Sequence, residues 1–150
     1  MMRSRGMILL ALAMLLGGCT ALNQPSAQVR EVALTQHTPQ GGRVEVTLEV
    51  FNPNDVPLPV RWASYQVQVE EAGRFVLTDL PPATLPPRGV QTITLAAAFE
   101  DGGALAGRAY EVSGELGYQP PGQIRELLTQ YRVPLPRVAF AGQGRLSSEP

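Results

Sequence analysis

The clearest pattern along the chain is an alternation of apolar and polar side chains with a period of two residues. Between Arg43 and Phe51 the residues Val44, Val46, Leu48 and Val50 alternate with polar ones. Because successive side chains of a strand point to opposite faces, this pattern predicts a strand with one face on a core and the other in water. The same period recurs over residues 89–99 and 110–118. It predicts two further strands of the same kind.

The alternation changes phase within residues 58–70. Apolar side chains stand on even positions up to Trp62 and on odd positions from Tyr65 onward. A strand cannot exchange its faces without an extra residue, so we expect a bulge or kink near Ala63–Ser64.

Turn-forming residues separate the predicted strands. The segment 52–55 reads Asn-Pro-Asn-Asp and predicts a sharp corner, and residues 71–73 predict a hairpin. Four prolines within residues 80–88 exclude a central strand there and favour an edge segment. Fourteen prolines and fifteen glycines in the whole chain argue against long helices.

Together these segments predict an all-β fold. Adding residues 29–36, 74–78 and 131–140 gives about seven strands, the last of them broken by Pro134 and Pro136. Residues 123–130 are compatible with helical turns or a loop, and residues 101–106 with a turn or a short helix. The regular turn signals favour an antiparallel β-sandwich of immunoglobulin or fibronectin type III shape over a parallel sheet.

The first nineteen residues have the layout of an export signal. Arg3 and Arg5 precede an apolar run from Met7 to Leu16, which is shorter than the roughly 20 residues of a membrane-spanning helix. The following Leu16-Gly17-Gly18-Cys19 resembles the bacterial lipobox, and Cys19 is the only cysteine. The alternative is an ordinary cleaved signal with a chance cysteine, but such signals end in a small-x-small site. We expect cleavage before Cys19 and a lipid anchor on it, which makes the membrane a partner.

These features predict four regions. We expect a signal peptide over residues 1–18, a lipidated cysteine and tether over 19–27, a sandwich over 28–141 and a flexible tail over 142–150. Thr20, rather than an Asp, follows Cys19. By the sorting rule of enteric bacteria, this residue favours the periplasmic face of the outer membrane within the cell envelope.

The titratable residues do not form a catalytic constellation. His37 is the only histidine, and it lies in a predicted turn. A serine nucleophile would therefore have no other histidine to act as its general base. The acidic pairs Glu70-Glu71 and Glu100-Asp101 read as solvated hairpin ends rather than as a calcium loop. Twelve basic residues, two of them in the leader, stand against thirteen acidic ones, so nothing indicates nucleic acid binding. We expect no enzyme activity, cofactor or metal, and keep an enzyme with a cryptic site as the least favoured alternative.

Several short motifs together resemble one known family. They are Asn52-Pro53-Asn54 after an alternating strand, Leu58-Pro59-Val60, Tyr65-Gln66-Val67, Leu85-Pro86 before Gly89, and Tyr110. The set, spread over residues 29–140, resembles the late embryogenesis abundant type-2 family, also called the water stress and hypersensitive response domain. The resemblance implies a seven-stranded fibronectin-like sandwich, bacterial members that are often lipoproteins, and a link to desiccation and stress tolerance. A shared fold alone does not establish an activity.

Two aromatic residues near the predicted bulge are open to two interpretations. Trp62 and Tyr65 fit a sandwich core, or they form an exposed pair that contacts a partner. With the resemblance, the sequence favours a non-enzymatic cell-envelope lipoprotein that acts as a protective or binding module. The alternative is a structural or assembly module that docks other envelope proteins through a sheet edge.

Overall fold

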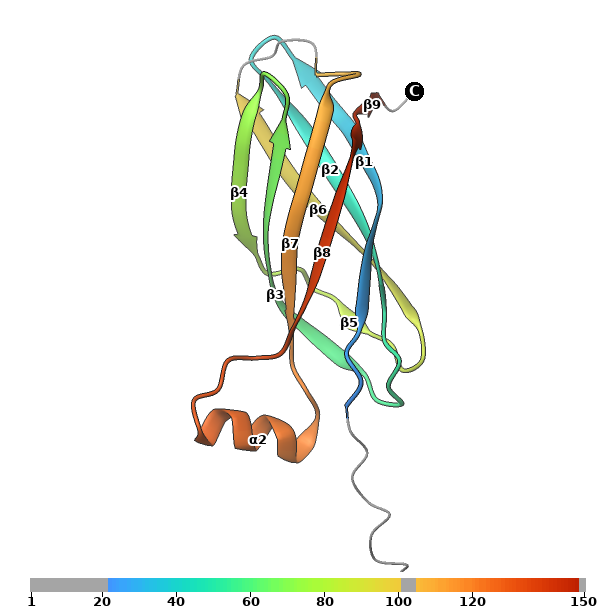
Figure 1. The fold of residues 1–150 in the computed structure, drawn as a ribbon, viewed down its shortest axis with the longest axis vertical. Helices are drawn as coiled ribbons and strands as arrows, with labels where there is room; N and C mark the ends of the chain where they lie inside the picture. Colours follow the sequence, from blue (N-terminus) through green and yellow to red (C-terminus); the bar gives the residue numbers. More distant parts are fainter. Residues whose placement is uncertain (1–21, 101–104, 149–150) are drawn as a thin grey trace, which may run out of the picture.

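The computed structural model describes residues 22–100 and 105–148, which form two sheets packed face to face (Figure 1). The elements are β1 (Ser26–Thr38), β2 (Gly41–Phe51), β3 (Leu58–Val69), β4 (Gly73–Asp79), β5 (Thr84–Leu85), β6 (Val90–Glu100), β7 (Ala109–Tyr118), α2 (Gly122–Gln130), β8 (Arg137–Arg145) and β9 (Ser147–Ser148). One sheet has the order β6-β2-β1-β9 and the other the order β4-β3-β7-β8, with β5 paired to β3. The expected all-β sandwich is confirmed, and seven of its strands are seven residues or longer.

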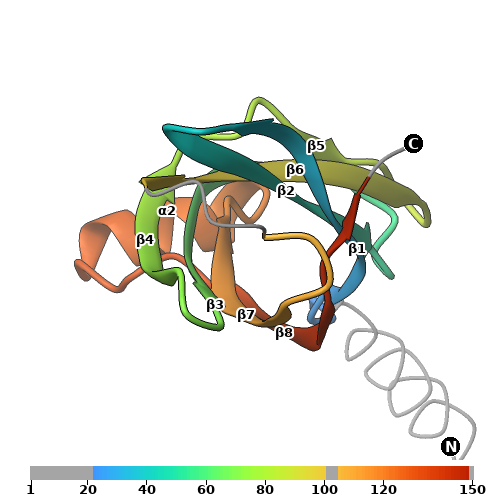
Figure 2. The same ribbon diagram turned by 90° about the horizontal axis from the view of Figure 1, so that it is seen from above.

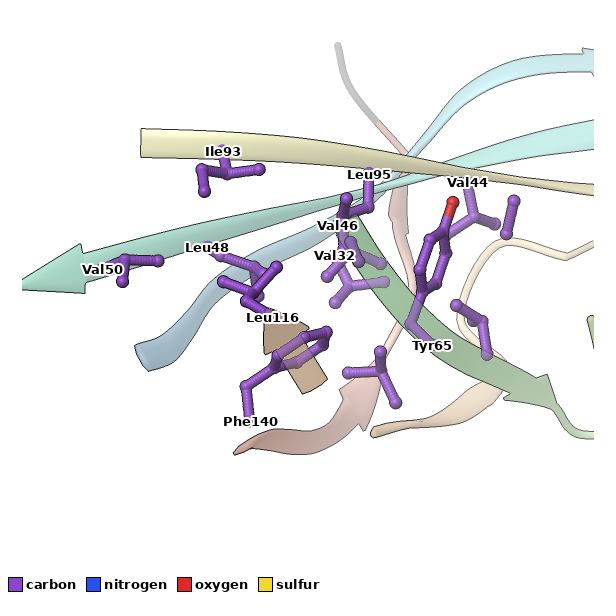
Figure 3. Close-up of a cluster of buried hydrophobic side chains, with 14 of the residues drawn as sticks. Val32, Val44, Val46, Leu48, Val50, Tyr65, Ile93, Leu95, Leu116 and Phe140 are labelled. Carbon is purple, nitrogen blue, oxygen red and sulfur yellow. The ribbon is translucent and has the colours of Figure 1, made fainter. Parts of the chain in front are cut away.

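The core lies between the two sheets, which Figure 2 shows end-on as two layers. The apolar residues of the alternating strand β2, from Val44 to Val50, are all 0% exposed. They meet Leu116 and Phe140 from the opposite sheet (Figure 3). Burying one such side chain fully stabilises the fold by about 1.5–3 kcal/mol. The period-two pattern therefore faces the core as predicted.

The two long sides of the sandwich are closed in different ways. On one side β8 passes close to β1, and a side chain at Gly142 would bring its Cβ within 2.9 Å of the Val29 Cβ. On the other side, the rings of Phe75 in β4 and Phe99 in β6 lie 6.2 Å apart between centroids. The sheets are thus held together along both borders.

The change of phase in β3 comes from a bulge, as expected, but two residues earlier. The register of β3 against β7 shifts between Val60 and Trp62, so Arg61 is the extra residue. From there on Ala63 faces the core, and Trp62 lies on the outer face of the sheet. Its indole fills the space above Gly117, where a Cβ would come within 2.2 Å of the ring.

Three segments differ from their predicted boundaries. β1 begins at Ser26. The last strand begins only at Arg137, because Pro134 and Pro136 cannot donate to a sheet. The tail expected to be flexible from residue 142 instead continues β8 to Arg145. It then buries Leu146 to 3% exposure, and Leu146 exchanges main-chain hydrogen bonds with residues 107–108.

The open alternatives are partly decided. Residues 123–130 lie in α2, which is placed at the end of the sandwich where β1 begins (Figure 1). Residues 101–104 and the predicted signal peptide with Cys19 lie outside the described residues. Within the described ranges, no helix combines the length and apolar character of a segment that crosses a bilayer.

Candidate functional site

Two asparagine side chains are buried at the corner between β2 and β3. Asn52 is 0% exposed and Asn54 is 7% exposed. They belong to the Asn-Pro-Asn segment that directly follows the alternating strand. A buried amide is costly unless its hydrogens and its oxygen find partners, so their hydrogen bonds determine what this corner does.

The amide of Asn52 joins separate segments of the chain. Its Nδ2 donates to the main-chain oxygens of Val56 (2.8 Å), Pro86 (3.1 Å) and Leu85 (3.3 Å). Its Oδ1 accepts from the main-chain nitrogen of Asn54 at 3.0 Å and from Asn54 Nδ2 at 2.9 Å. One side chain therefore fixes the β2–β3 corner against the proline-rich segment that follows β5.

The amide of Asn54 holds the N-terminal segment. Its Nδ2 donates to the main-chain oxygen of Asn23 at 2.8 Å, and the main-chain nitrogen of Asn23 donates to Asn54 Oδ1 at 2.8 Å. The side chain thus pairs with the backbone of residue 23 as a neighbouring strand would. Part of the segment expected to be a free tether is fixed to the sandwich.

A third contact closes the corner at its surface. The main-chain nitrogen of Arg88, at a positive φ of 50°, donates to the Asn54 main-chain oxygen at 2.9 Å. The Arg88 guanidinium binds both oxygens of Asp55, at 2.6 and 3.1 Å. This bond lowers the pKa of the Asp55 carboxyl, although an exposed ion pair contributes little to stability.

A cavity of about 430 Å³ lies beside the corner, between the N-terminal segment and α2. Its apolar walls come from Leu22, Pro53, Val56, Pro121 and Ile124, and its polar rim from Asp55 and Arg88. Among the described residues no buried side-chain nitrogen or oxygen lacks a hydrogen-bond partner. The amides of the corner are therefore occupied by structural contacts, and the cavity exposes polar and apolar surface in about equal parts.

The two aromatic residues singled out in the sequence do not form one surface. Tyr65 is 2% exposed, points into the core (Figure 3) and donates its hydroxyl to the Ala96 main-chain oxygen. Burial raises the pKa of this phenol. Trp62 lies on the opposite face of β3. A contact between Trp62 and a partner stays a prediction.

The remaining titratable candidates are dispersed. His37 is exposed near the end of β1, where it pairs with Gly42. The sequence predicted a turn beginning at His37, but β1 and β2 remain paired through Thr38 and Gly41. Glu71 lies in the hairpin after β3 at a positive φ of 57°. In the part of the chain that the structure describes, no group of three or more His, Cys, Asp or Glu could hold a metal ion.

Two features of this end were missed in the sequence. The role of Asn23 had no signal, because only its main-chain atoms bind Asn54. The apolar residues of α2 did carry one: Ile124, Leu127, Leu128 and Tyr131 have the spacing i, i+3, i+4, i+7 of an amphipathic helix. In a segment this short, bordered by Pro120-Pro121 and Pro134, the spacing alone does not distinguish helical turns from a loop.

We expect the side chains of Asn52 and Asn54 to contribute much more to the free energy of unfolding than the side chain of Asn23. Asn52→Ala leaves buried carbonyls and the Asn54 amide without partners, and should lower the free energy of unfolding by about 2–4 kcal/mol. Asn54→Ala should cost about 1–3 kcal/mol and also expose the Asn23 amide to hydrogen exchange. Denaturant unfolding and hydrogen exchange measure both effects.

Asn23→Ala is the matched control for these variants. It keeps the main-chain atoms that bind Asn54, so its stability should stay within about 0.5 kcal/mol of the unaltered protein. A loss as large as that of Asn54→Ala, or an Asn52→Ala variant of normal stability, would contradict the assigned contacts.

Comparison with known proteins gives a clear result for the fold alone. No protein family and no curated protein matches the chain in sequence. Among solved structures, it is similar to one described as a late embryogenesis abundant (LEA) protein, with a TM-score of 0.58 and 16% identity over 95% of this chain and 86% of that one. A protein from Arabidopsis thaliana also has a TM-score of 0.58 and 16% identity, over 89% of this chain and 88% of that one.

A crystal structure of a protein from Archaeoglobus fulgidus is also similar. It has a TM-score of 0.50 and 12% identity, over 87% of this chain and 99% of that one. Identities this low carry information on the fold and not on the activity. The chain therefore adopts a late embryogenesis abundant type-2 fold, as its sequence motifs implied.

Proposed function

We propose that this chain is a non-enzymatic cell-envelope lipoprotein of the late embryogenesis abundant type-2 family, acting as a protective or binding module. Its anchor is a lipid on Cys19, and its location is the periplasmic face of the outer membrane. The observation that carries the proposal is the pairing of Asn54 with the main chain of Asn23, four residues after Cys19. A lipid at Cys19 would hold the corner end of the sandwich next to the membrane.

The chemistry of the corner supports binding rather than catalysis. The amides of Asn52 and Asn54 are used in contacts with each other and with main-chain atoms. The neighbouring cavity has apolar walls, and its charged groups Asp55 and Arg88 bind each other. A cavity whose polar groups are already engaged in such contacts suits the binding of a partner better than proton transfer.

The lipid anchor predicts a defined mass. The purified protein should begin at Cys19 and carry a thioether-linked diacylglycerol and an acylated amine, because three chains make membrane attachment nearly permanent. Intact-protein mass spectrometry measures this. Cys19→Ser should remove the lipid mass, Thr20→Ser should keep it, and Thr20→Asp should move the protein to the inner membrane in an enteric host. An intact leader or a free thiol on Cys19 would disprove the anchor.

A protective role predicts that the protein preserves other proteins during water loss. A labile test enzyme dried with an equimolar amount of the purified lipoprotein in vesicles should keep more activity than with vesicles alone. An unrelated β-sandwich protein of similar net charge controls for general crowding. Equal recovery of enzyme activity in all three mixtures would disprove the protective role and leave a binding module as the proposed function.

A specific feature of the fold also favours the second candidate, an assembly module that docks partners through a sheet edge. β4 pairs only with β3, so its other edge is open within the described residues. Val76 is 66% exposed and Leu77 is 38% exposed in the middle of this strand. Edge strands are usually protected by charges or prolines, and an apolar open edge can accept a strand from another protein.

The edge candidate predicts that one envelope protein is crosslinked next to Val76 in living cells. Val76→Lys should abolish this product, because a charge in the middle of an edge strand opposes strand addition. Ser113→Lys, on the outer face of the interior strand β7, is the control and should leave the product unchanged. Crosslinks that both variants leave unchanged would exclude this edge.

A further inference from the structure

The exposed large apolar side chains are concentrated in two places. Of nine such residues among those described, Val76, Leu77 and Leu80 lie on or just after the edge strand β4. The other six lie at the corner end of the sandwich: Phe51, Val90, Ile124, Leu127, Tyr131 and Val133. The second group is the larger, and four of its members belong to α2 and the residues that follow it.

Helix α2 is amphipathic, and most of its apolar face is left uncovered by the described residues. On a helix, Ile124, Leu127, Leu128 and Tyr131 fall within an arc of about 100°. None of the helical residues is buried; Leu127 is 53% exposed, and Tyr131, directly after the helix, is 69% exposed. In Figure 1 the helix projects from the end of the sandwich. A helix of this kind needs another surface to cover its apolar face.

The segment between Cys19 and Leu22 is short, so a lipid on Cys19 would hold a membrane close to α2. Leu22 lines the same cavity as Ile124 of α2. Leu22 is the third residue after Cys19, and three residue steps span at most about 11 Å when fully extended. A diacylglycerol on Cys19 would therefore hold the bilayer surface within that distance of the cavity. The apolar face of α2 is close enough to reach the headgroup region.

The charges around the apolar face also fit a bilayer. Arg125 and Arg132 are exposed beside it, and neither takes part in an ion pair within the described part of the chain. Arginine side chains can extend from an apolar surface and bind lipid phosphates with two hydrogen bonds. Helices with an apolar face and flanking arginines lie in the membrane interface.

We propose that the apolar face of α2, formed by Ile124, Leu127, Leu128 and Tyr131, lies in the headgroup region of the membrane to which the lipid on Cys19 anchors the chain. The inference rests on the proposed lipid anchor and adds a second contact with the same bilayer. With two contacts, the lipid and the helix, the sandwich has a fixed orientation on the membrane instead of swinging on its tether.

The test compares two exposed valines on the purified full lipoprotein. Val133→Cys, next to α2, and Val76→Cys, on the β4 edge, each receive a fluorescent label, since the thiol of Cys19 is blocked by lipid. The proteins are reconstituted in vesicles of phosphatidylglycerol and phosphatidylethanolamine that contain a nitroxide-labelled lipid. We expect the nitroxide to reduce the emission at residue 133 at least about twofold and to leave residue 76 nearly unchanged, because only the first lies in the interface.

Two further variants test the apolar face itself. Ile124→Gln with Leu127→Gln should abolish quenching at residue 133, whereas Thr129→Gln, on the opposite side of the helix, should preserve it. Both sets of residues are exposed, so neither change disturbs the core. Quenching that the double variant retains, equal quenching at residues 76 and 133, or no quenching at residue 133 would overturn the inference.

The mass of the same purified protein separates this inference from the anchor. Lipid adducts without quenching at residue 133 would leave the anchor valid and disprove the helix contact. A protein without lipid that still shows quenching at residue 133 would disprove the anchor and retain the helix contact with the bilayer. A free Cys19 thiol would also take up the dye, so in this case both labelled proteins are prepared again with Cys19→Ser before the quenching is measured.

Discussion

The hydrogen bonds of the Asn52 amide are the constraint on which the corner end of the sandwich depends. This side chain is completely buried, and it donates to the main-chain oxygens of Val56 in the corner, Leu85 in β5 and Pro86 directly after β5. Its oxygen also orients Asn54, which in turn binds the backbone of Asn23. A buried amide is stable only when its hydrogen-bond partners are in place. The β2–β3 corner, residues 85–86 and the N-terminal segment are therefore held in place cooperatively.

This constraint gives the Asn-Pro-Asn motif a structural role at the corner. Asn52 and Asn54 are aimed at main-chain atoms, which any sequence with the same backbone supplies. Pro53 lies between them and has no N–H that would need a partner. The motif therefore serves the fold, which leaves contacts with other molecules to the side chains that surround the corner. Here those are the apolar residues of the cavity and of α2.

The sequence predicted the parts of this structure that depend on side-chain alternation. The strands β2, β6 and β7 have a period of two that their burial reproduces, and the change of phase in β3 required the bulge at Arg61. A residue that is held only through its main-chain atoms gives no signal in the sequence, which is why the predicted tether includes Asn23. The end of β8 was missed for a related reason: residues 141–145 contain small and polar side chains, and their position in the sheet depends on pairing with β7.

The two exposed apolar regions face different surroundings if the corner end rests on a membrane. α2 lies at that end, whereas β4 runs along the side of the sandwich (Figure 1). An oriented sandwich would therefore keep the open edge of β4 away from the bilayer, where a strand of another protein could reach it. A sandwich that swung on its tether would present this edge in all directions, and docking would cost the orientational freedom that the tether allows. Contact of α2 with lipid would thus reduce the cost of an interaction at β4, so that the membrane and the edge could act together.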